Sequence, residues 1–158
     1  MNKIIFLIVC LMFCLSDICY SGVYLEEIVK TQWANLGNRI IISTNQNNNY
    51  KIVIFDESGK QINEIQIKNK MKEFAVSPDG KKIIYSTNGK GTWLINTEKT
   101  NEMQIDNNNG TNFQWSPDSK RVVFTIIENL DNKIYINCYL VSEDEKNKKK
   151  IYSIQLTP

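Results

Sequence analysis

The sequence predicts an all-β fold made of three similar units, each with four short antiparallel strands. A central segment, F-A-V-S-P-D-G-K-K-I-I-Y at residues 74–85, aligns without gaps to F-Q-W-S-P-D-S-K-R-V-V-F at 113–124. A weaker copy, T-Q-W-A-N-L-G-N-R-I-I-I at 31–42, precedes both, and the starts of the copies lie 43 and 39 residues apart. A period of about 40 residues is typical of stacked repeats. Between the copies, short apolar segments alternate with loops rich in Asn and Gly, which indicates strands and turns.

Each unit begins with a short strand that ends at a large apolar residue and runs into a tight turn. Proline pre-sets the first central dihedral angle of such a turn, aspartate tolerates the left-handed region, and glycine accepts a positive φ. The turn residues of the two better copies are Ser77, Pro78, Asp79 and Gly80, and Ser116, Pro117 and Asp118. We assign these residues a structural role, with the serines capping the turns.

The remaining strands follow in a regular order. The second strand of each unit contains three consecutive large apolar residues (40–42, 83–85 and 122–124), which indicates burial on both faces. Third strands are expected at 51–55, 92–96 and 133–141, and fourth strands at 61–67, 101–105 and 149–156. Four antiparallel strands per unit, stacked so that each sheet covers its neighbour, form the blades of a β-propeller. The three blades span approximately 31–67, 72–105 and 111–156 of a propeller region at 22–158.

The repeat string F-x-h-S-P-D-[GS]-K-[KR]-h-h-[YF], where h is a large apolar residue, resembles the WD-like propeller repeat of TolB-type periplasmic proteins. The same repeat occurs in the propeller domains of prolyl oligopeptidase and dipeptidyl peptidase relatives. The resemblance implies an incomplete TolB-like propeller, because about three blades are present whereas closed propellers usually have four to eight. Nothing before the first repeat matches the N-terminal α/β domain of TolB. Two explanations stay open: a truncated reading frame, or missing blades that come from another chain.

Four aromatic residues of the repeats are expected to pack between blades: Trp33, Phe74, Phe113 and Trp115. An interior role predicts that both tryptophans are buried. Exposed aromatic rings at a blade end would instead favour ligand binding.

Residues 1–21 have the form of a secretory signal peptide. Lys3 precedes an apolar stretch at 4–15, and Cys19 and Ser21 provide small residues at the −3 and −1 positions for cleavage after Ser21. The stretch is shorter than the roughly 20 apolar residues of a membrane-spanning helix. We expect a periplasmic or secreted protein without a stable membrane span after cleavage, with an uncleaved N-terminal anchor as the alternative. The remaining cysteine, Cys138, is expected to be a small buried hydrophobe.

The composition excludes several classes of function. The chain contains no histidine, so Ser-His-Asp catalysis, HExxH zinc sites and Cys/His zinc clusters are not possible. A net charge of +2 does not favour nucleic-acid binding. Asp79 and Asp118 recur at one repeat position, which is typical of a structural turn and not of a catalytic pair. We therefore expect no catalytic, cofactor-binding or metal-binding residue and no cofactor.

Three polar segments are candidate binding sites, each with a structural alternative. S-T-N-G-K-G-T-W at 86–93 is a partial match to the Asp-box of sialidases, but Asn replaces Asp, so a hairpin loop with a packed Trp93 is preferred. D-N-N-N-G at 106–110 fails the EF-hand spacing and is interpreted as a solvated linker between blades. The acidic-to-basic segment 143–150 is interpreted as a soluble turn, with a docking patch as the alternative.

The leading hypothesis is a non-enzymatic exported protein that binds another protein, of unknown identity, in the periplasm or cell envelope. A second hypothesis is the leading piece of a longer exported protein, such as a prolyl-oligopeptidase-type peptidase. A third is a propeller that binds a small ligand or a carbohydrate. Because an isolated three-blade array exposes two apolar faces, we also expect self-association through the terminal blades or poor solubility.

Overall fold

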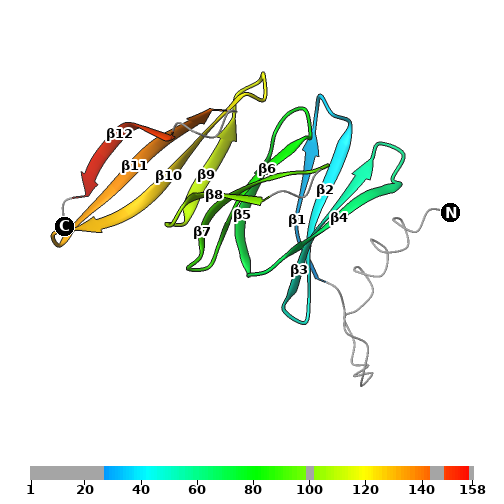
Figure 1. The fold of residues 1–158 in the computed structure, drawn as a ribbon, viewed down its shortest axis with the longest axis horizontal. Coiled ribbons are helices and arrows are strands. Elements are labelled where there is room, and N and C mark those ends of the chain that lie inside the picture. Colours follow the sequence, from blue (N-terminus) through cyan, green and yellow to red (C-terminus); the bar gives the residue numbers. More distant parts are fainter. Residues whose placement is uncertain (1–26, 99–101, 143–147, 157–158) are drawn as a thin grey trace, which may run out of the picture.

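The computed structural model describes residues 27–98, 102–142 and 148–156. Within these residues the chain forms twelve β-strands in three four-stranded antiparallel sheets, which confirms the predicted all-β fold (Figure 1). The expected signal peptide at 1–21 lies outside the described residues.

Each sheet is a simple meander and is called a blade here. Blade 1 contains β1 (Glu27–Ala34), β2 (Arg39–Gln46), β3 (Asn49–Asp56) and β4 (Gln61–Ile67). Blade 2 contains β5 (Met71–Val76), β6 (Lys82–Thr87), β7 (Gly91–Asn96) and β8 (Glu102–Asp106). Blade 3 contains β9 (Gly110–Trp115), β10 (Arg121–Leu130), β11 (Lys133–Ser142) and β12 (Lys148–Leu156).

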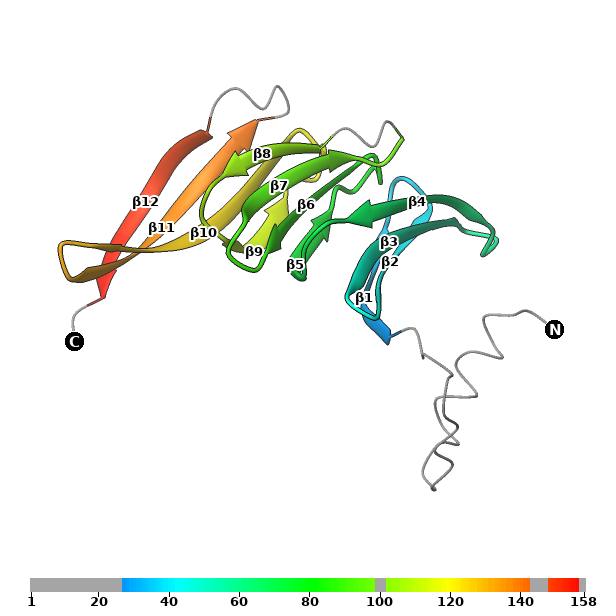
Figure 2. The ribbon, with the colours of Figure 1, turned by 60° about the horizontal axis from the view of Figure 1, so that its bottom comes forward.

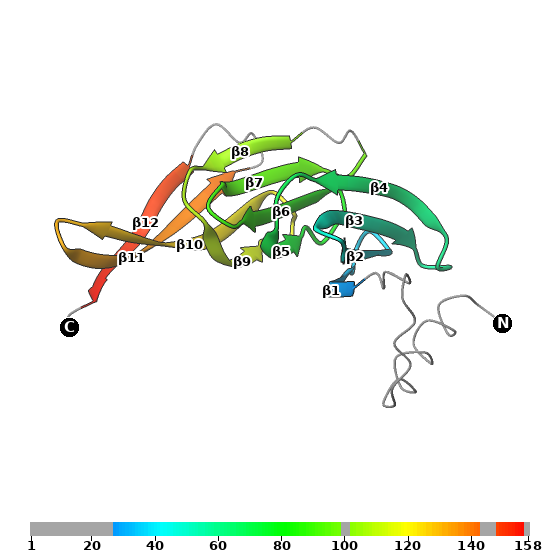
Figure 3. The ribbon, with the colours of Figure 1, turned by 90° about the horizontal axis from the view of Figure 1, so that it is seen from below.

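The three blades follow one another in space as they do in sequence, with blade 2 between the other two (Figures 2 and 3). Within every blade, neighbouring strands are consecutive in the chain, so no connection crosses a sheet. Stacked four-stranded meanders of this kind make a partial β-propeller.

The Ser-Pro-Asp turns join the first and second strands of blades 2 and 3 with the same hydrogen bonds. Ser77 Oγ donates to Asp79 Oδ1 (2.6 Å) and accepts from the Lys82 amide (2.9 Å). Gly80 closes the turn with a φ of 71°, and its amide donates to the Ser77 carbonyl. In blade 3, Ser116 Oγ repeats the contact to Asp118 Oδ1 (2.5 Å). The serine hydroxyl and the aspartate carboxylate thus satisfy amides that the strand ladder leaves unpaired.

The degenerate first copy keeps its glycine for a different reason. Asn38, and not Gly37, takes the positive φ in that turn (47°). A Cβ atom on Gly37 would overlap the backbone carbonyl of Asp79 in the turn of blade 2. The amides of Leu36 and Gly37 both donate to the Pro78 carbonyl, at 2.8 and 3.1 Å. Gly37 therefore permits the close approach of two blades.

Two apolar clusters hold the blades together, one on each face of blade 2. Ile83 and Tyr85 of β6 face blade 1, whereas Ile84 faces blade 3, and all three side chains are fully buried. Burial of each such side chain contributes about 1.5–3 kcal/mol. The predicted burial on both faces therefore holds for blade 2. It fails at the ends of the array, where Ile42 and Val123 are only half-buried because no other described blade covers their face of the sheet.

The expectation that both repeat tryptophans are buried is wrong for Trp33, which is 51% exposed. No sheet precedes β1 within the described residues, so nothing covers its indole ring. Trp115 is half-buried against blade 2, and its Nε1–H donates to the Ala75 carbonyl (3.1 Å). Phe74 is buried, and Phe113 packs against Phe124 with ring centroids 5.8 Å apart.

Candidate functional site

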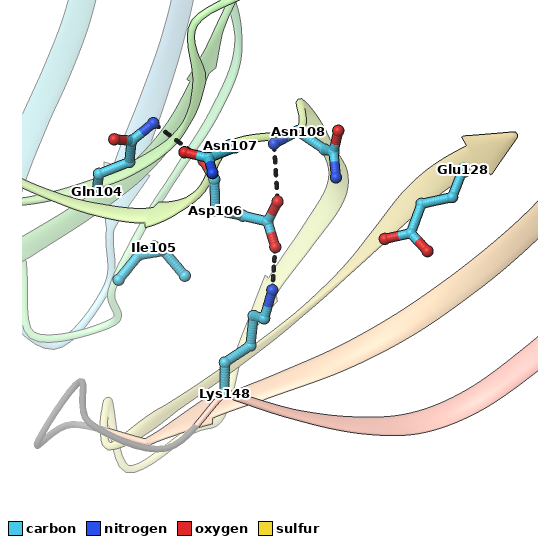
Figure 4. A pocket seen from close by; sticks show the side chains of 7 residues that line it. All are labelled: Gln104, Ile105, Asp106, Asn107, Asn108, Glu128 and Lys148. Atoms are coloured by element: carbon cyan, nitrogen blue, oxygen red, sulfur yellow. Dashed lines mark hydrogen bonds and ion pairs between the residues drawn. The ribbon is translucent and has the colours of Figure 1, made fainter. Parts of the chain in front are cut away.

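A polar pocket of about 330 Å³ lies where the last strands of blades 2 and 3 approach each other (Figure 4). Its lining residues are Gln104, Ile105, Asp106, Asn107, Asn108, Glu128 and Lys148. They come from β8, from the linker between the blades, from β10 and from β12, so the pocket exists only when the two blades are stacked.

Asp106 and Lys148 form the central contact of the pocket. The Asp106 side chain is 5% exposed, and its carboxylate forms an ion pair with Lys148 Nζ of β12. The same carboxylate accepts the amide hydrogen of Asn108 at 2.7 Å, which orders the start of the linker (Figure 4). This ion pair joins the fourth strands of blades 2 and 3, and its two residues lie 42 positions apart in the sequence.

Further contacts within blade 3 connect Lys148 to side chains of β10, β11 and β12. Lys148 Nζ lies 4.6 Å from the centroid of the Tyr139 ring. The Tyr139 hydroxyl donates to Glu128 Oε1 (3.2 Å), and the Asn137 side-chain amide donates to Glu128 Oε2 (2.6 Å). Ser153 Oγ in turn donates to Asn137 Oδ1 (2.6 Å). The network satisfies polar atoms of three strands at once.

The protonation of Tyr139 follows from this environment. Burial of the phenol raises the pKa of Tyr139 to about 12, and the negative charge of Glu128 and its hydrogen bond act in the same direction. The group therefore stays protonated and works as a hydrogen-bond donor at neutral pH. It cannot act as a base there.

The chemistry of the pocket favours a structural role. The ammonium group of Lys148 is held by a carboxylate and an aromatic ring, which leaves it poorly placed to act as a nucleophile. Among the described residues no three acidic or Cys side chains lie close enough together to hold a metal ion. The arrangement joins two blades and offers hydrogen-bonding groups to solvent.

Sequence reasoning missed this site. The interpretation of 106–110 as a solvated linker is wrong for Asp106, which is 8% exposed because β12 of the next blade covers it. Residues 143–147 of the acidic-to-basic segment lie outside the described residues. Lys148, the next residue of that segment, forms the ion pair with Asp106 of blade 2. No local pattern marks a pair whose members belong to different repeats.

The segment at 86–93 forms the end of β6, a hairpin loop and the start of β7, as predicted. Trp93 packs against the cluster between blades 1 and 2, and its Nε1–H donates to the Lys90 carbonyl (2.9 Å). The indole is therefore engaged by its own hairpin.

A second feature of the molecule is its uncovered sheet faces. In β10, Ile126 is fully buried against blade 2, whereas its neighbour Ile127 points to the other side and is 64% exposed. The large exposed apolar residues of blade 3 are Ile127, Leu130, Ile134, Ile151, Tyr152, Ile154 and Leu156. The strand registers place five of them on one face, which is called the outer face of blade 3: Ile127, Ile134, Tyr152, Ile154 and Leu156. At the opposite end of the array, Ile28 and Trp33 are exposed on blade 1.

Cys138 also belongs to the outer face of blade 3. It pairs with Thr125 in the β10–β11 ladder and is half-buried, so the expectation of a buried side chain is met only in part. In the described part of the chain, no helix is long and apolar enough to cross a membrane.

Solved structures share this fold. The chain superposes on the Pyrococcus horikoshii acylaminoacyl peptidase with a TM-score of 0.62 and 16% identity, over 83% of this chain and 25% of the peptidase. It matches the tricorn protease with a TM-score of 0.62 and 12% identity, over 78% of this chain and 13% of that protein. The β-propeller domain of the Trilobed protease from Pyrococcus furiosus, described as having an open velcro topology, gives a TM-score of 0.58 and 15% identity, over 83% and 43%.

The fold therefore places the chain in the class of β-propellers, as a partial propeller that is structurally similar to peptidase propeller domains. The chain spans a quarter of the acylaminoacyl peptidase and less than half of the Trilobed propeller domain. At these identities the likeness concerns the fold alone. No family model matches the sequence. No curated protein matches it either.

Proposed function

We propose that this chain is a non-enzymatic, exported, TolB-like propeller protein that binds another protein chain through its terminal blades. The observation that carries the proposal is the outer face of blade 3, a sheet surface with large exposed apolar residues from three strands. Contiguous exposed apolar surface on a soluble domain marks an interaction site. A propeller blade normally has a neighbour on each face, so a protein surface is the natural cover.

The absence of histidine and the engaged state of Lys148 and Tyr139 support a binding role over an enzymatic one. The form of residues 1–21 supports export to the periplasm or the medium. Fractionation of the producing cells, together with the covalent mass of the purified chain, tests this part. Loss of residues 1–21 and recovery outside the cytoplasm are expected, whereas a full-length cytoplasmic chain would contradict export.

In-cell photo-crosslinking tests the binding role. A photoreactive amino acid placed at Ile127 or Tyr152 should give a discrete adduct with one protein. The same probe at Lys60, an exposed position in a hairpin of blade 1, should give none. A lysine at position 154 should abolish the adduct, because it places a charge on the apolar face. Equal labelling at all positions, or an adduct that survives I154K, would refute the proposal.

A second candidate is the leading piece of a longer exported peptidase, in which a propeller precedes an α/β-hydrolase domain. It is favoured by the similarity to the acylaminoacyl peptidase, of which the chain spans a quarter. The downstream DNA discriminates. An in-frame continuation with further Ser-Pro-Asp-Gly repeats and a G-x-S-x-G motif would establish this candidate, and its absence would remove it.

A third candidate, a propeller that binds a small ligand or a carbohydrate, called for an exposed aromatic side chain at a blade end. Trp33 meets that condition. Its exposure has a simpler cause, because the equivalent Trp115 has a blade beneath it, whereas no sheet of the described part of the chain lies beneath Trp33.

A further inference from the structure

A second, smaller pocket lies on the outer face of blade 3, beside the Ser-Pro-Asp turn. Its volume is about 250 Å³, and it is lined by Gln114, Trp115, Ser116, Arg121, Val123 and Leu140. The walls are mainly apolar, because Val123 and Leu140 lie opposite each other in the β10–β11 ladder. The volume is below the roughly 300–1,000 Å³ of typical small-molecule sites. It suits a single large side chain better than a ligand.

The equivalent position on blade 2 is covered by a side chain of the next blade. Ala75, Ile84 and Leu94 occupy the places on blade 2 that Gln114, Val123 and Leu140 occupy on blade 3, as the two strand registers show. Trp115 of the following blade packs against this set on blade 2.

A hydrogen bond fixes the direction of that indole, since Trp115 Nε1–H donates to the Ala75 carbonyl (3.1 Å). The position on blade 2 is therefore a seat for the tryptophan of the next blade.

The chain carries one more tryptophan of this type, at its other end. Trp33 aligns with Trp115 in the repeat and ends β1 as Trp115 ends β9. The residue is 51% exposed, because no described blade lies beneath it. The two ends of the array thus display a tryptophan and a seat for a tryptophan.

A second contact between blades points to the same match. At the junction of blades 1 and 2, Gln32 Oε1 accepts the amide hydrogen of Val76 (3.0 Å). Gln114 occupies the repeat position of Gln32, and Trp33 occupies that of Val76. Stacking blade 1 of another copy on blade 3 would therefore reproduce both the glutamine contact and the tryptophan contact.

We propose that a second copy of this chain covers the outer face of blade 3, head to tail, with its Trp33 indole seated between Gln114, Val123 and Leu140. This inference rests on the proposed protein-binding role of the terminal blades. The described residues of two copies form six blades, a number within the range of closed propellers, whereas those of a single copy form three. A head-to-tail contact that closes on itself leaves no terminal face uncovered.

Complementation between two variants tests the proposal, with the chain purified as it accumulates in the cell. Trp33→Ala removes the tryptophan at an exposed position. Gln114→Arg places a long charged side chain over the seat, also at an exposed position. Leu36→Ala, at a 72% exposed residue of the turn that lies against blade 2, is the matched control for loss of exposed apolar surface from blade 1. Sedimentation equilibrium gives the dissociation constants, and circular dichroism checks that each variant folds.

The expected pattern has three parts. The wild type and L36A form dimers, whereas W33A and Q114R each raise the dissociation constant at least about 30-fold, which corresponds to a tryptophan hot spot of about 2 kcal/mol. An equimolar mixture of W33A and Q114R forms a heterodimer, because the intact Trp33 of one variant meets the intact seat of the other. A face-to-face dimer would not be rescued in this way.

Other outcomes would overturn the inference. A monomeric wild type, an unchanged affinity in W33A, or a mixture that stays monomeric would each show that Trp33 does not fill this seat. The protein-binding role would survive any of these results if Ile127 still crosslinks to a different protein. It would fail separately if Ile127 gives no adduct. A fourth blade of a longer chain over this face would be revealed as a covalent continuation in the mass of the purified protein, and would also overturn the second copy.

Discussion

Replacement of Lys148 by methionine tests whether the ion pair between blades 2 and 3 stabilises the fold. Removing one partner of a buried pair typically costs about 3–5 kcal/mol, because the other charge is left uncompensated. The Asp106 side chain is 5% exposed, but the Lys148 side chain is 33% exposed and the pocket is open to solvent. Water can therefore replace part of the interaction. We expect K148M to lower the free energy of unfolding by about 2 kcal/mol.

Asp106→Asn completes a double-mutant cycle. The asparagine oxygen can still accept the Asn108 amide, and a lone Lys148 can turn toward water, so D106N should cost about 1 kcal/mol. In the D106N background, loss of the lysine leaves no buried charge behind. The double variant should therefore be no less stable than K148M alone, which gives a coupling energy of about 1 kcal/mol.

Urea denaturation measures these differences, with all variants at one protein concentration so that self-association affects them equally. Lys120→Met, at an exposed lysine of the blade 3 turn, is the matched control and should change stability by less than about 0.5 kcal/mol. A K148M cost no larger than that of K120M would refute the account of the pocket. Additive effects of D106N and K148M would do the same.

Three further outcomes follow from the structure. Gly37→Ala should destabilise the protein by about 2–3 kcal/mol in urea, because its Cβ would overlap the turn of blade 2. Gly89→Ala is the control: its Cβ meets no neighbouring atom, so it should cost only about 1 kcal/mol from its positive φ. Equal costs of the two variants would contradict the close approach of blades 1 and 2 at Gly37. The Ser116 hydroxyl, and to a smaller extent the Lys120 amide, lowers the pKa of Asp118. The stability that the Asp118 carboxylate contributes is therefore present above about pH 4 and is lost as the pH falls through the lowered pKa. S116A should raise the pKa of Asp118 in an NMR titration, and an unchanged titration would exclude this cause. The pKa of Tyr139 lies at about 12 in the folded chain and near 10 in the unfolded chain. The stability that protonated Tyr139 contributes is therefore fully present below pH 10, and the free energy of unfolding should fall by about 2–3 kcal/mol as the pH rises to 12. An alkaline loss of the same size in Y139F would show that another group is responsible.

The fold was predictable because its signals are local and repeated. The Ser-Pro-Asp turn fixes where the first strand of a blade reverses, and its hydrogen bonds involve residues only two to five positions apart. Fourth strands were expected at 61–67, 101–105 and 149–156, and β4, β8 and β12 occupy 61–67, 102–106 and 148–156. Turn chemistry and apolar runs were therefore sufficient to place the strands.

The features that sequence reasoning missed depend on contacts between blades. The burial of a repeat tryptophan depends on whether a sheet precedes its strand, which the residues around Trp33 do not encode. Asp106 lies in a polar, Asn-rich segment that is typical of a solvated loop, and only the return of β12 covers it. The partner of Asp106 lies 42 residues away in another repeat. Such a pair leaves no periodic signal in the sequence.

The molar mass of the purified chain in solution, followed by light scattering over a wide concentration range, tests the central claim most directly. The claim is that a second copy of this chain covers the terminal blades of the partial propeller. We expect a particle of two chains that Ile127→Lys converts to single chains. A wild-type chain that stays monodisperse and monomeric at every concentration, with its apolar faces open to water, would contradict it.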